Sequence, residues 1–217
     1  TKLHYNNRQL RVEEATAQIG QNKLGFDGDI NLSLKSPSVI GQVSASGNNL
    51  AELASGLDIA NIPAAKFSAG AALSIKGGSI ALQNASAQLP NADIALDMVA
   101  SGEDYADITF DLNAKGTNLA NIVPASNAWI PPASPFSISA RGSISTAVVD
   151  IDSGSAKLGG AEADFSGKID LKPIFRLHKL DVHAAGERLA DLGQFSDWEL
   201  TTKPFALSAE FNATKSG

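Results

Sequence analysis

KFSAGAALSIK, Lys66 to Lys76, is the stretch that decides the fold, because its apolar residues recur at every second position. Successive side chains of a β-strand point to opposite faces, so a period of two predicts a strand with one apolar face. The polar face would carry Lys66, Ser68, Ser74 and Lys76, and the apolar face Phe67, Ala69, Ala71, Leu73 and Ile75.

The same alternation recurs along the rest of the chain. Turn-rich breaks such as KGGS, SGED and LKP separate the alternating runs and are short enough to join antiparallel neighbours. We therefore predict an all-β fold, an antiparallel meander of about twelve strands. Its further apolar runs are Ile30, Leu32, Leu34; Ile94, Leu96, Met98; Ile108, Phe110, Leu112; Phe165, Gly167, Ile169, Leu171; and Phe205, Leu207, Ala209, Phe211.

A second regularity is the motif G-x-x-L-A-x-L, with Ile122 as its last residue in the second copy. It begins at Gly47, Gly116 and Gly186, at separations of 116 − 47 = 69 and 186 − 116 = 70 residues. A fixed period indicates stacked repeats that are too open to bury their apolar faces alone. We predict one continuous repeat segment over 1–217: the C-terminal part of a repeat (1–46), full repeats (47–115 and 116–185), and the start of a further repeat (186–217).

The motif itself carries a helical signal. Its two apolar residues, such as Leu50 and Leu53, are three positions apart and would share one face of a helical turn. We interpret each copy as a short helical connector that packs onto the end of the sheet. A repeated motif could also mark a functional site, but we interpret this one as structural.

The apolar series also changes parity at three equivalent places. The shifts fall between Val12 and Ala15, between Leu82 and Ala85, and between Ile151 and Gly154. An extra residue in a strand keeps the apolar face inward through a bend, so we predict β-bulges there. Coincident bulges would bend the sheet into a trough. The predicted bulge residues are Glu13–Glu14, Gln83–Asn84 and Asp152–Ser153.

Composition excludes several classes of function. The 17 Lys and Arg against 23 Asp and Glu give a net charge of −6 without a polybasic run, which disfavours nucleic acid as a partner. The chain has no cysteine and hence no disulfide or thiolate metal site. It has no apolar run of ~20 residues, the length that spans a bilayer. Its opening residues lack the layout of a signal peptide, so we expect any anchor to lie outside this segment.

Enzymatic signatures are weak. His178 and His183 would lie on opposite faces of a strand and His4 is remote, so no metal or other cofactor is expected. The sequence contains no G-x-S-x-G elbow, P-loop or G-x-G-x-x-G motif. We therefore expect no enzymatic activity and no catalytic residue.

Two features remain open at this level. Two pairs of carboxylates each share a strand face, namely Asp107 with Asp111 and Asp150 with Asp152. Paired carboxylates are the catalytic groups of glycosidases. These residues belong to the polar series, however, which indicates a solvated face. Trp129 and Trp198 each precede the Pro-Phe start of a strand. Two interpretations are open: they pack onto the sheet rim, or they contact a lipid or a partner.

The strand texts FSAGAAL and ADFSGKIDLKP, the period near 70 and the G-x-x-L-A-x-L connector resemble the repeats of the AsmA-like family, the AsmA/TamB/YhdP group of Gram-negative envelope proteins. The resemblance covers nearly the whole chain. It implies a sheet curled into an open β-taco groove, in the periplasmic part of a protein anchored in the inner membrane. It also implies a bridge-like lipid transfer protein that carries phospholipid acyl chains between the inner and outer membranes.

Two further functions stay open. One is assembly of outer-membrane β-proteins, held as partners through exposed sheet edges, and the weaker one is a passive spacer. The competing structure is a sheet whose apolar faces meet in a closed core.

In the groove, small residues (Ala69, Ala71, Ala87, Ala156, Ala163, Gly167) would leave width for an acyl chain. The lining is predicted to include Leu32, Phe67, Ala71, Leu73, Ile75, Ile80, Leu82, Ile94, Leu96, Ile108, Phe110, Leu112, Phe136, Ile138, Val149, Ile151, Phe165, Ile169, Phe205 and Leu207.

Overall fold

The structure is a computed structural model of the chain. It describes residues 1–33, 35–55, 64–123, 129–146, 148–170, 176–194 and 201–212, without the side chains of 176–178 and 211–212. The predictions for Leu34, Leu171 and Trp198 fall outside these ranges, as does the side chain of His178.

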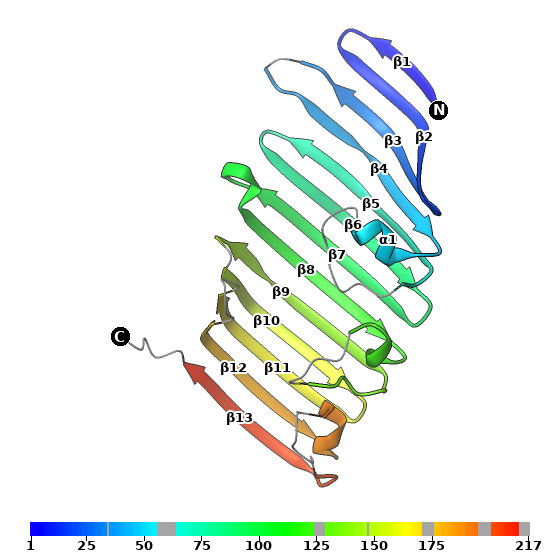
Figure 1. Cartoon of the computed structure of the whole chain (residues 1–217). Coiled ribbons are helices and arrows are strands. Elements are labelled where there is room, and N and C mark those ends of the chain that lie inside the picture. Colours follow the sequence, from blue (N-terminus) through cyan, green and yellow to red (C-terminus); the bar gives the residue numbers. More distant parts are fainter. Residues whose placement is uncertain are drawn as a thin grey trace. The chain divides into compact units, whose positions relative to one another are not determined.

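The chain divides into two compact units, Thr1–Ala106 and Asp107–Gly217, and this boundary falls inside the predicted repeat 47–115. Each unit is an antiparallel meander in which strands that are consecutive in the sequence are neighbours (Figure 1). The described residues contain thirteen strands, close to the number expected, and the all-β fold class is confirmed.

The first unit contains strands of mostly ten or eleven residues. The alternation of apolar and polar residues along each strand matches the alternation of half-buried and exposed side chains, as β7 shows throughout its length. The elements are β1 (Lys2–Asn6), β2 (Gln9–Ile19), β3 (Asn22–Asn31), β4 (Ser38–Gly47), α1 (Leu50–Ser55), β5 (Phe67–Lys76), β6 (Ser79–Leu89), β7 (Ala92–Ser101) and the 3-10 turn η1 (Glu103–Tyr105).

The second unit repeats this layout. Residues 148–158 and 79–89 form equivalent eleven-residue strands 69 positions apart, which agrees with the repeat length read from the sequence. The elements are β8 (Asp107–Gly116), η2 (Leu119–Asn121), β9 (Phe136–Ser145), β10 (Val148–Leu158), β11 (Ala161–Asp170), β12 (Arg176–Gly186), η3 (Leu189–Leu192) and β13 (Phe205–Asn212).

All three predicted bulges are confirmed. The pairing register shifts between Val12 and Ala15 in β2, between Leu82 and Ala85 in β6, and between Ile151 and Gly154 in β10. In the first two bulges a carboxylate stabilises the extra residue. The backbone N–H of Asn84 donates to Asp97 over 2.6 Å, and that of Glu14 donates to Asp27 over 3.3 Å.

The helical connectors are confirmed as well. Each copy of the motif forms a short helical turn, namely α1, η2 and η3. The Asn118 side chain accepts a hydrogen bond from the Ala120 N–H at the start of η2, and Leu119 is only 2% exposed. Such a turn covers the apolar residues at the strand end on which it packs.

Most of the buried apolar residues lie at the connector ends of the strands or in the connectors themselves. Phe67 starts β5, Ala92 starts β7, Phe136 starts β9 and Ala161 starts β11, and all four are no more than 6% exposed. The apolar residues farther along the strands are mostly half-buried. Within each unit, therefore, no described element covers the middle of the apolar face as a closed core would require.

Candidate functional site

The strand registers of the first unit assemble the apolar residues into rows across the sheet. Paired residues of neighbouring strands lie on the same face, so each row crosses from β2 to β7. One row is Ala17, Leu24, Ala45, Ala69, Ala87 and Ile94, and the next contains Ala15, Phe26, Val43, Ala85 and Leu96.

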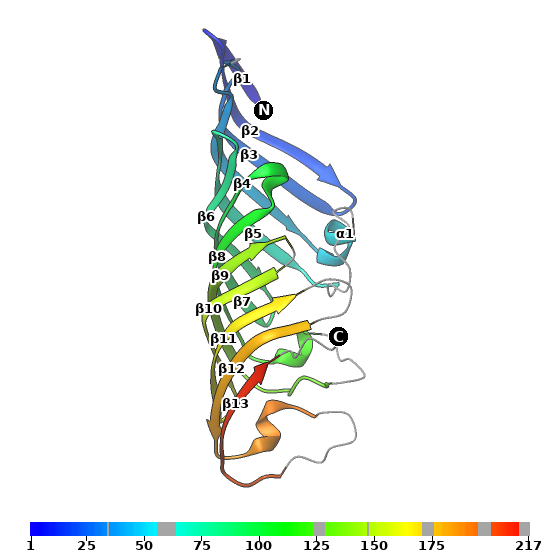
Figure 2. The ribbon, with the colours of Figure 1, turned by 90° about the vertical axis from the view of Figure 1, so that its left-hand side faces the viewer.

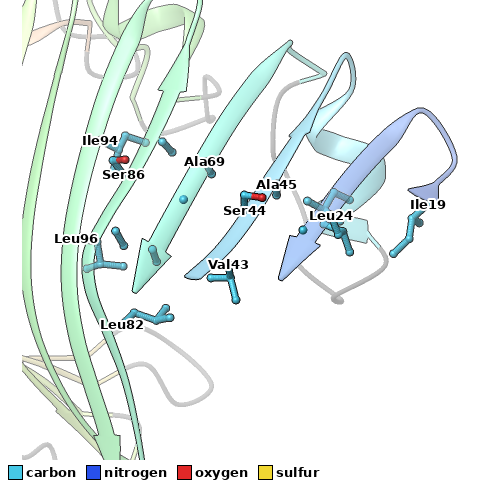
Figure 3. A pocket seen from close by; sticks show the side chains of 16 residues that line it. Ile19, Leu24, Val43, Ser44, Ala45, Ala69, Leu82, Ser86, Ile94 and Leu96 are labelled. Atoms are coloured by element: carbon cyan, nitrogen blue, oxygen red, sulfur yellow. The ribbon is translucent and has the colours of Figure 1, made fainter. Parts of the chain in front are cut away.

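Most residues of these rows, from β3 to β7, line an apolar groove of 660 Å³ in the first unit. Figure 3 shows Leu24, Val43, Leu82 and Leu96 extending from different strands, with the short side chains of Ala45 and Ala69 between them. The lining residues are Ile19, Leu24, Gly25, Val43, Ser44, Ala45, Leu53, Ala69, Gly70, Ala71, Leu82, Ala85, Ser86, Ala87, Ile94 and Leu96.

Small residues determine the depth of the groove. Alanine leaves space where a larger side chain in the same row would fill it, and Ala45, Ala69 and Ala87 follow one another in a single row. Nearer the hairpin turns, Gly28 pairs with Gly41. A Cβ at Gly28 would lie 2.6 Å from the Gly41 Cα and 2.8 Å from the Phe26 ring, so the aromatic ring packs directly on the glycine backbone.

The connector helix α1 bounds the groove at one end. Leu53 of α1 is part of the lining, and the helix stands to one side of the strands in Figure 2. The Glu52 carboxylate accepts a 3.2 Å hydrogen bond from the side-chain amide of Asn22, which is fully buried at the start of β3. The Leu50 N–H donates to the Ala65 carbonyl over 2.9 Å. These bonds tie the first turn of α1 to neighbouring chain.

The residues predicted to line the groove in the first unit divide into three groups. Ala71, Leu82, Ile94 and Leu96 are in the lining. The remaining strand residues share the face but lie elsewhere: Leu73, Ile75 and Ile80 toward the hairpin turns, and Phe67, only 4% exposed, at the connector end. Leu32 follows the end of β3 and is 50% exposed.

The predicted residues of the second unit also share one face through the strand registers. Ile108, Val149 and Ile169 belong to one row, Phe110 and Ile151 to the next, and Leu112 and Phe165 to a third. Ile138 and Leu207 belong to a fourth row, and Phe136 and Phe205 to the row at the connector end. Phe136 is 6% exposed, whereas Leu207 is 40% exposed.

A substitution between the repeats changes the depth of this face. Ala85 and Leu96 in the groove of the first unit correspond to Gly154 and Phe165 in the second. A Cβ at Gly154 would lie 2.2 Å from the Phe165 ring, so the ring occupies the space above that glycine. The equivalent positions thus line an open groove in the first unit, whereas in the second unit an aromatic ring fills the corresponding space.

Several lining residues were not in the predicted list. Leu24 and Val43 belong to alternating runs, LGFDG and VIGQVSAS, in which glycines interrupt the apolar series and weaken the signal. Ile19 and Leu53 lie at a strand end and in the connector, where periodicity says nothing of proximity to a groove. Only the folded connector brings Leu53 to the strands.

One carboxylate of each candidate pair, Asp111 or Asp150, lies in an ion pair on the polar face. Asp111 accepts a 3.0 Å hydrogen bond from Arg141 Nε, and the Asp150 carboxylate lies 2.6 Å from Lys168 Nζ. These bonds and the carboxylate charges raise the pKa values of Arg141 and Lys168. Carboxylates paired with cations on an exposed face match the solvated-face interpretation.

The described residues contain no group of three or more His, Asp or Glu side chains that could hold a metal ion. His183 Nδ1 lies 2.9 Å from Ser208 Oγ on an exposed strand surface, and His4 Nε2 lies 4.0 Å from Glu13. The histidines whose side chains are described are therefore engaged with single neighbours.

Trp129 packs within the connector region of the second unit. Its indole N–H donates a 2.9 Å hydrogen bond to the Leu192 carbonyl of η3, and Ile130 pairs with Gln194. Asp191 of η3 is 8% exposed, accepts from the Gly160 N–H and lies 2.7 Å from Arg188. The rim-packing interpretation of Trp129 agrees with these contacts.

Comparison of the chain with protein-family models, with curated proteins and with solved structures finds no match. The family resemblance therefore rests on the sequence pattern alone. Within the described ranges, no helix reaches the length and apolarity needed to cross a bilayer.

Proposed function

We propose that this chain is a periplasmic segment of a bridge-like lipid transfer protein, anchored in the inner membrane through another part of the protein, whose apolar groove carries phospholipid acyl chains between the inner and outer membranes. The observation that carries the proposal is the apolar groove of 660 Å³ in the first unit. The membrane route and the periplasmic location rest on the family resemblance.

The energetics of an acyl chain favour such a groove. Exposing an acyl chain to water costs ~0.8 kcal/mol per methylene group, so a carrier must cover most of its length. The groove offers alkyl side chains from consecutive strands, and its alanines leave space for the chain. Because these side chains are only half-buried in the protein, a bound acyl chain would supply the cover that they lack.

The test compares two neighbouring alanines of β5. Ala71 lines the groove, whereas Ala72 lies on the opposite face, where it pairs with Gln42 and Gln83. We expect Ala71→Asp to abolish co-purification of phospholipid, measured by mass spectrometry, because a carboxylate in an apolar groove must stay hydrated. Ala72→Asp introduces the same charge and should leave the bound lipid unchanged. Equal lipid content in wild type and Ala71→Asp would overturn the proposal.

Assembly of outer-membrane β-proteins is the second candidate function. It would act through a strand that exposes apolar side chains, as β1 does with Leu3 and Tyr5, which are 62% and 67% exposed. An exposed strand can accept a partner strand through backbone hydrogen bonds. Binding of an outer-membrane strand peptide that survives Ala71→Asp would support this function over lipid transfer.

A further inference from the structure

The apolar face of the first unit has two different rims. At one rim, short turns join β1 to β2, β3 to β4 and β5 to β6; at the other lies the connector helix α1 (Figure 1). We call these the hairpin rim, at residues 7–8, 32–33, 35–37 and 77–78 with their flanking residues, and the connector rim, at residues 20–21, 48–55, 64–66 and 90–91.

Each of those three turns of the hairpin rim carries or adjoins a cation. Arg8 lies in the first turn, Lys35 in the second, and Lys76 ends β5 at the third. All three are exposed and have no ion-pair partner among the described residues. Successive turns on one rim are two strands apart, so the cations recur at roughly 10 Å intervals.

Some cations of the chain, unlike those of the hairpin rim, lie in ion pairs. On the polar face Arg11, Arg141 and Lys168 each lie against a carboxylate. The first unit has 7 Lys and Arg against 10 Asp and Glu, a net charge of 7 − 10 = −3, so three successive turns that carry a cation and no acidic residue stand out against its composition. This series ends at η1, where Glu103 and Asp104 are acidic.

The connector rim has mixed charge. Lys23 and Lys66 lie near it together with Glu52 and Asp93. The connector rim is distinguished by apolar side chains, since Leu53 of α1 and Ile19 line the adjoining end of the groove. The face therefore runs from cationic at the hairpin rim to apolar and covered at the connector rim.

The face between the two rims is apolar along its whole length. From Ile75 to Ala69 along β5, six residues span about 20 Å. One acyl chain crosses half of a bilayer's ~30 Å hydrocarbon core, so it needs roughly 15 Å. The face is long enough for a chain that lies parallel to the strands.

Resting on the lipid-binding function proposed above, we infer that the groove takes an anionic, phosphate-bearing lipid in one orientation. The phosphate lies at the hairpin rim against Arg8, Lys35 and Lys76, and the acyl chain runs along the strands until its end reaches Leu53. Lys76 occupies a polar-face position at the end of its strand, and its flexible stem lets the ammonium reach the rim. Exposed ammonium–phosphate contacts are individually weak and salt-screened, so they bias orientation and headgroup choice more than affinity.

The test uses two matched charge reversals. Lys35→Glu/Lys76→Glu removes two hairpin-rim cations, and Lys23→Glu/Lys66→Glu makes the same change of charge near the connector rim. The probes are dioleoylphosphatidylglycerol, dioleoylglycerol with the same tails but no phosphate, and inorganic phosphate. We expect the hairpin-rim variant to bind dioleoylphosphatidylglycerol about tenfold more weakly at low salt, and the control to bind it within about twofold of wild type. Dioleoylglycerol should bind all three proteins equally.

Each alternative outcome contradicts a different statement. Equal loss of dioleoylphosphatidylglycerol in both double variants would show that general charge, and not the hairpin rim, governs binding. Inorganic phosphate that binds wild type and is lost in the hairpin-rim variant, with lipid binding unchanged, would make the rim a free-phosphate site. If wild type and Ala71→Asp bind the lipid equally, or wild type binds none, the lipid groove itself is wrong. If Ala71→Asp alone loses it, only the orientation is wrong.

Discussion

Phe136 and Phe165 lie on the same face of the second unit, yet the structure treats them differently. Phe136 starts β9 at the connector end and is 6% exposed, whereas Phe165 lies in mid-strand in β11 and is half-buried. The first unit repeats the contrast, with Phe67 buried at the connector end and Ala71 in the groove. The connector end resembles a small hydrophobic core, and the middle of the face resembles a binding surface. One alternating pattern thus produces a stabilising region and an accessible one.

The prediction with the largest expected effect replaces one phenylalanine by alanine in each region. Phe136→Ala should lower the free energy of unfolding by about 3–5 kcal/mol, because it leaves a cavity among buried neighbours. Phe165→Ala should cost less than about half of that, since part of its ring is already in water. Urea unfolding of the two variants measures both values. Equal losses would mean that mid-strand packing stabilises the unit as much as the connector end does.

A smaller effect is expected from the bond that joins two connectors of the second unit. Trp129→Phe keeps an aromatic ring but removes the N–H that donates to the Leu192 carbonyl over 2.9 Å. We expect a loss of about 1 kcal/mol in the free energy of unfolding, the typical value for one hydrogen bond. Trp129→Ala also removes ring packing and should cost more. A Trp129→Phe variant as stable as wild type would assign the residue to packing alone.

The smallest effect belongs to the exposed charges. The hydrogen bond from Lys157, followed by its positive charge, lowers the pKa of Glu162 below its ordinary value of 4.5. A carboxyl group whose pKa is lower in the folded state stabilises the protein above its unfolded pKa, and this contribution is lost as the pH falls through the folded pKa. Wild type should therefore exceed Glu162→Gln slightly in urea midpoint at neutral pH, with the difference vanishing as the pH falls through the lowered pKa of Glu162. A difference that persists in acid would contradict this origin.

Much of the fold could be predicted because it depends on local alternation. The parity changes at Glu13–Glu14, Gln83–Asn84 and Asp152–Ser153 predict bulges that the registers contain. The Leu pairs of the repeated motif predict the helical turns α1, η2 and η3. Both signals lie within a few residues of the feature they describe, so no long-range contact is needed to read them.

The candidate site was predictable only in part. Ala71, Leu82, Ile94 and Leu96 line the groove as expected, but Phe67 is covered and Leu32 lies beyond its strand. Periodicity identifies the face on which a residue lies. It says nothing of which part of that face a distant connector covers, and the coverage by α1 depends on contacts such as that of Glu52 with Asn22, 30 positions away.

The sequence by itself determined the strands, their apolar face, the repeat length and the positions of the bulges, because each follows from side-chain alternation and steric rules along a few consecutive residues. Tertiary structure alone decided where that face stays open. The fold places α1 beside the strands, brings Leu53 to the end of the groove, and aligns Arg8, Lys35 and Lys76 along one rim. These arrangements join residues far apart in the chain, and only strand pairing and connector packing can bring them together.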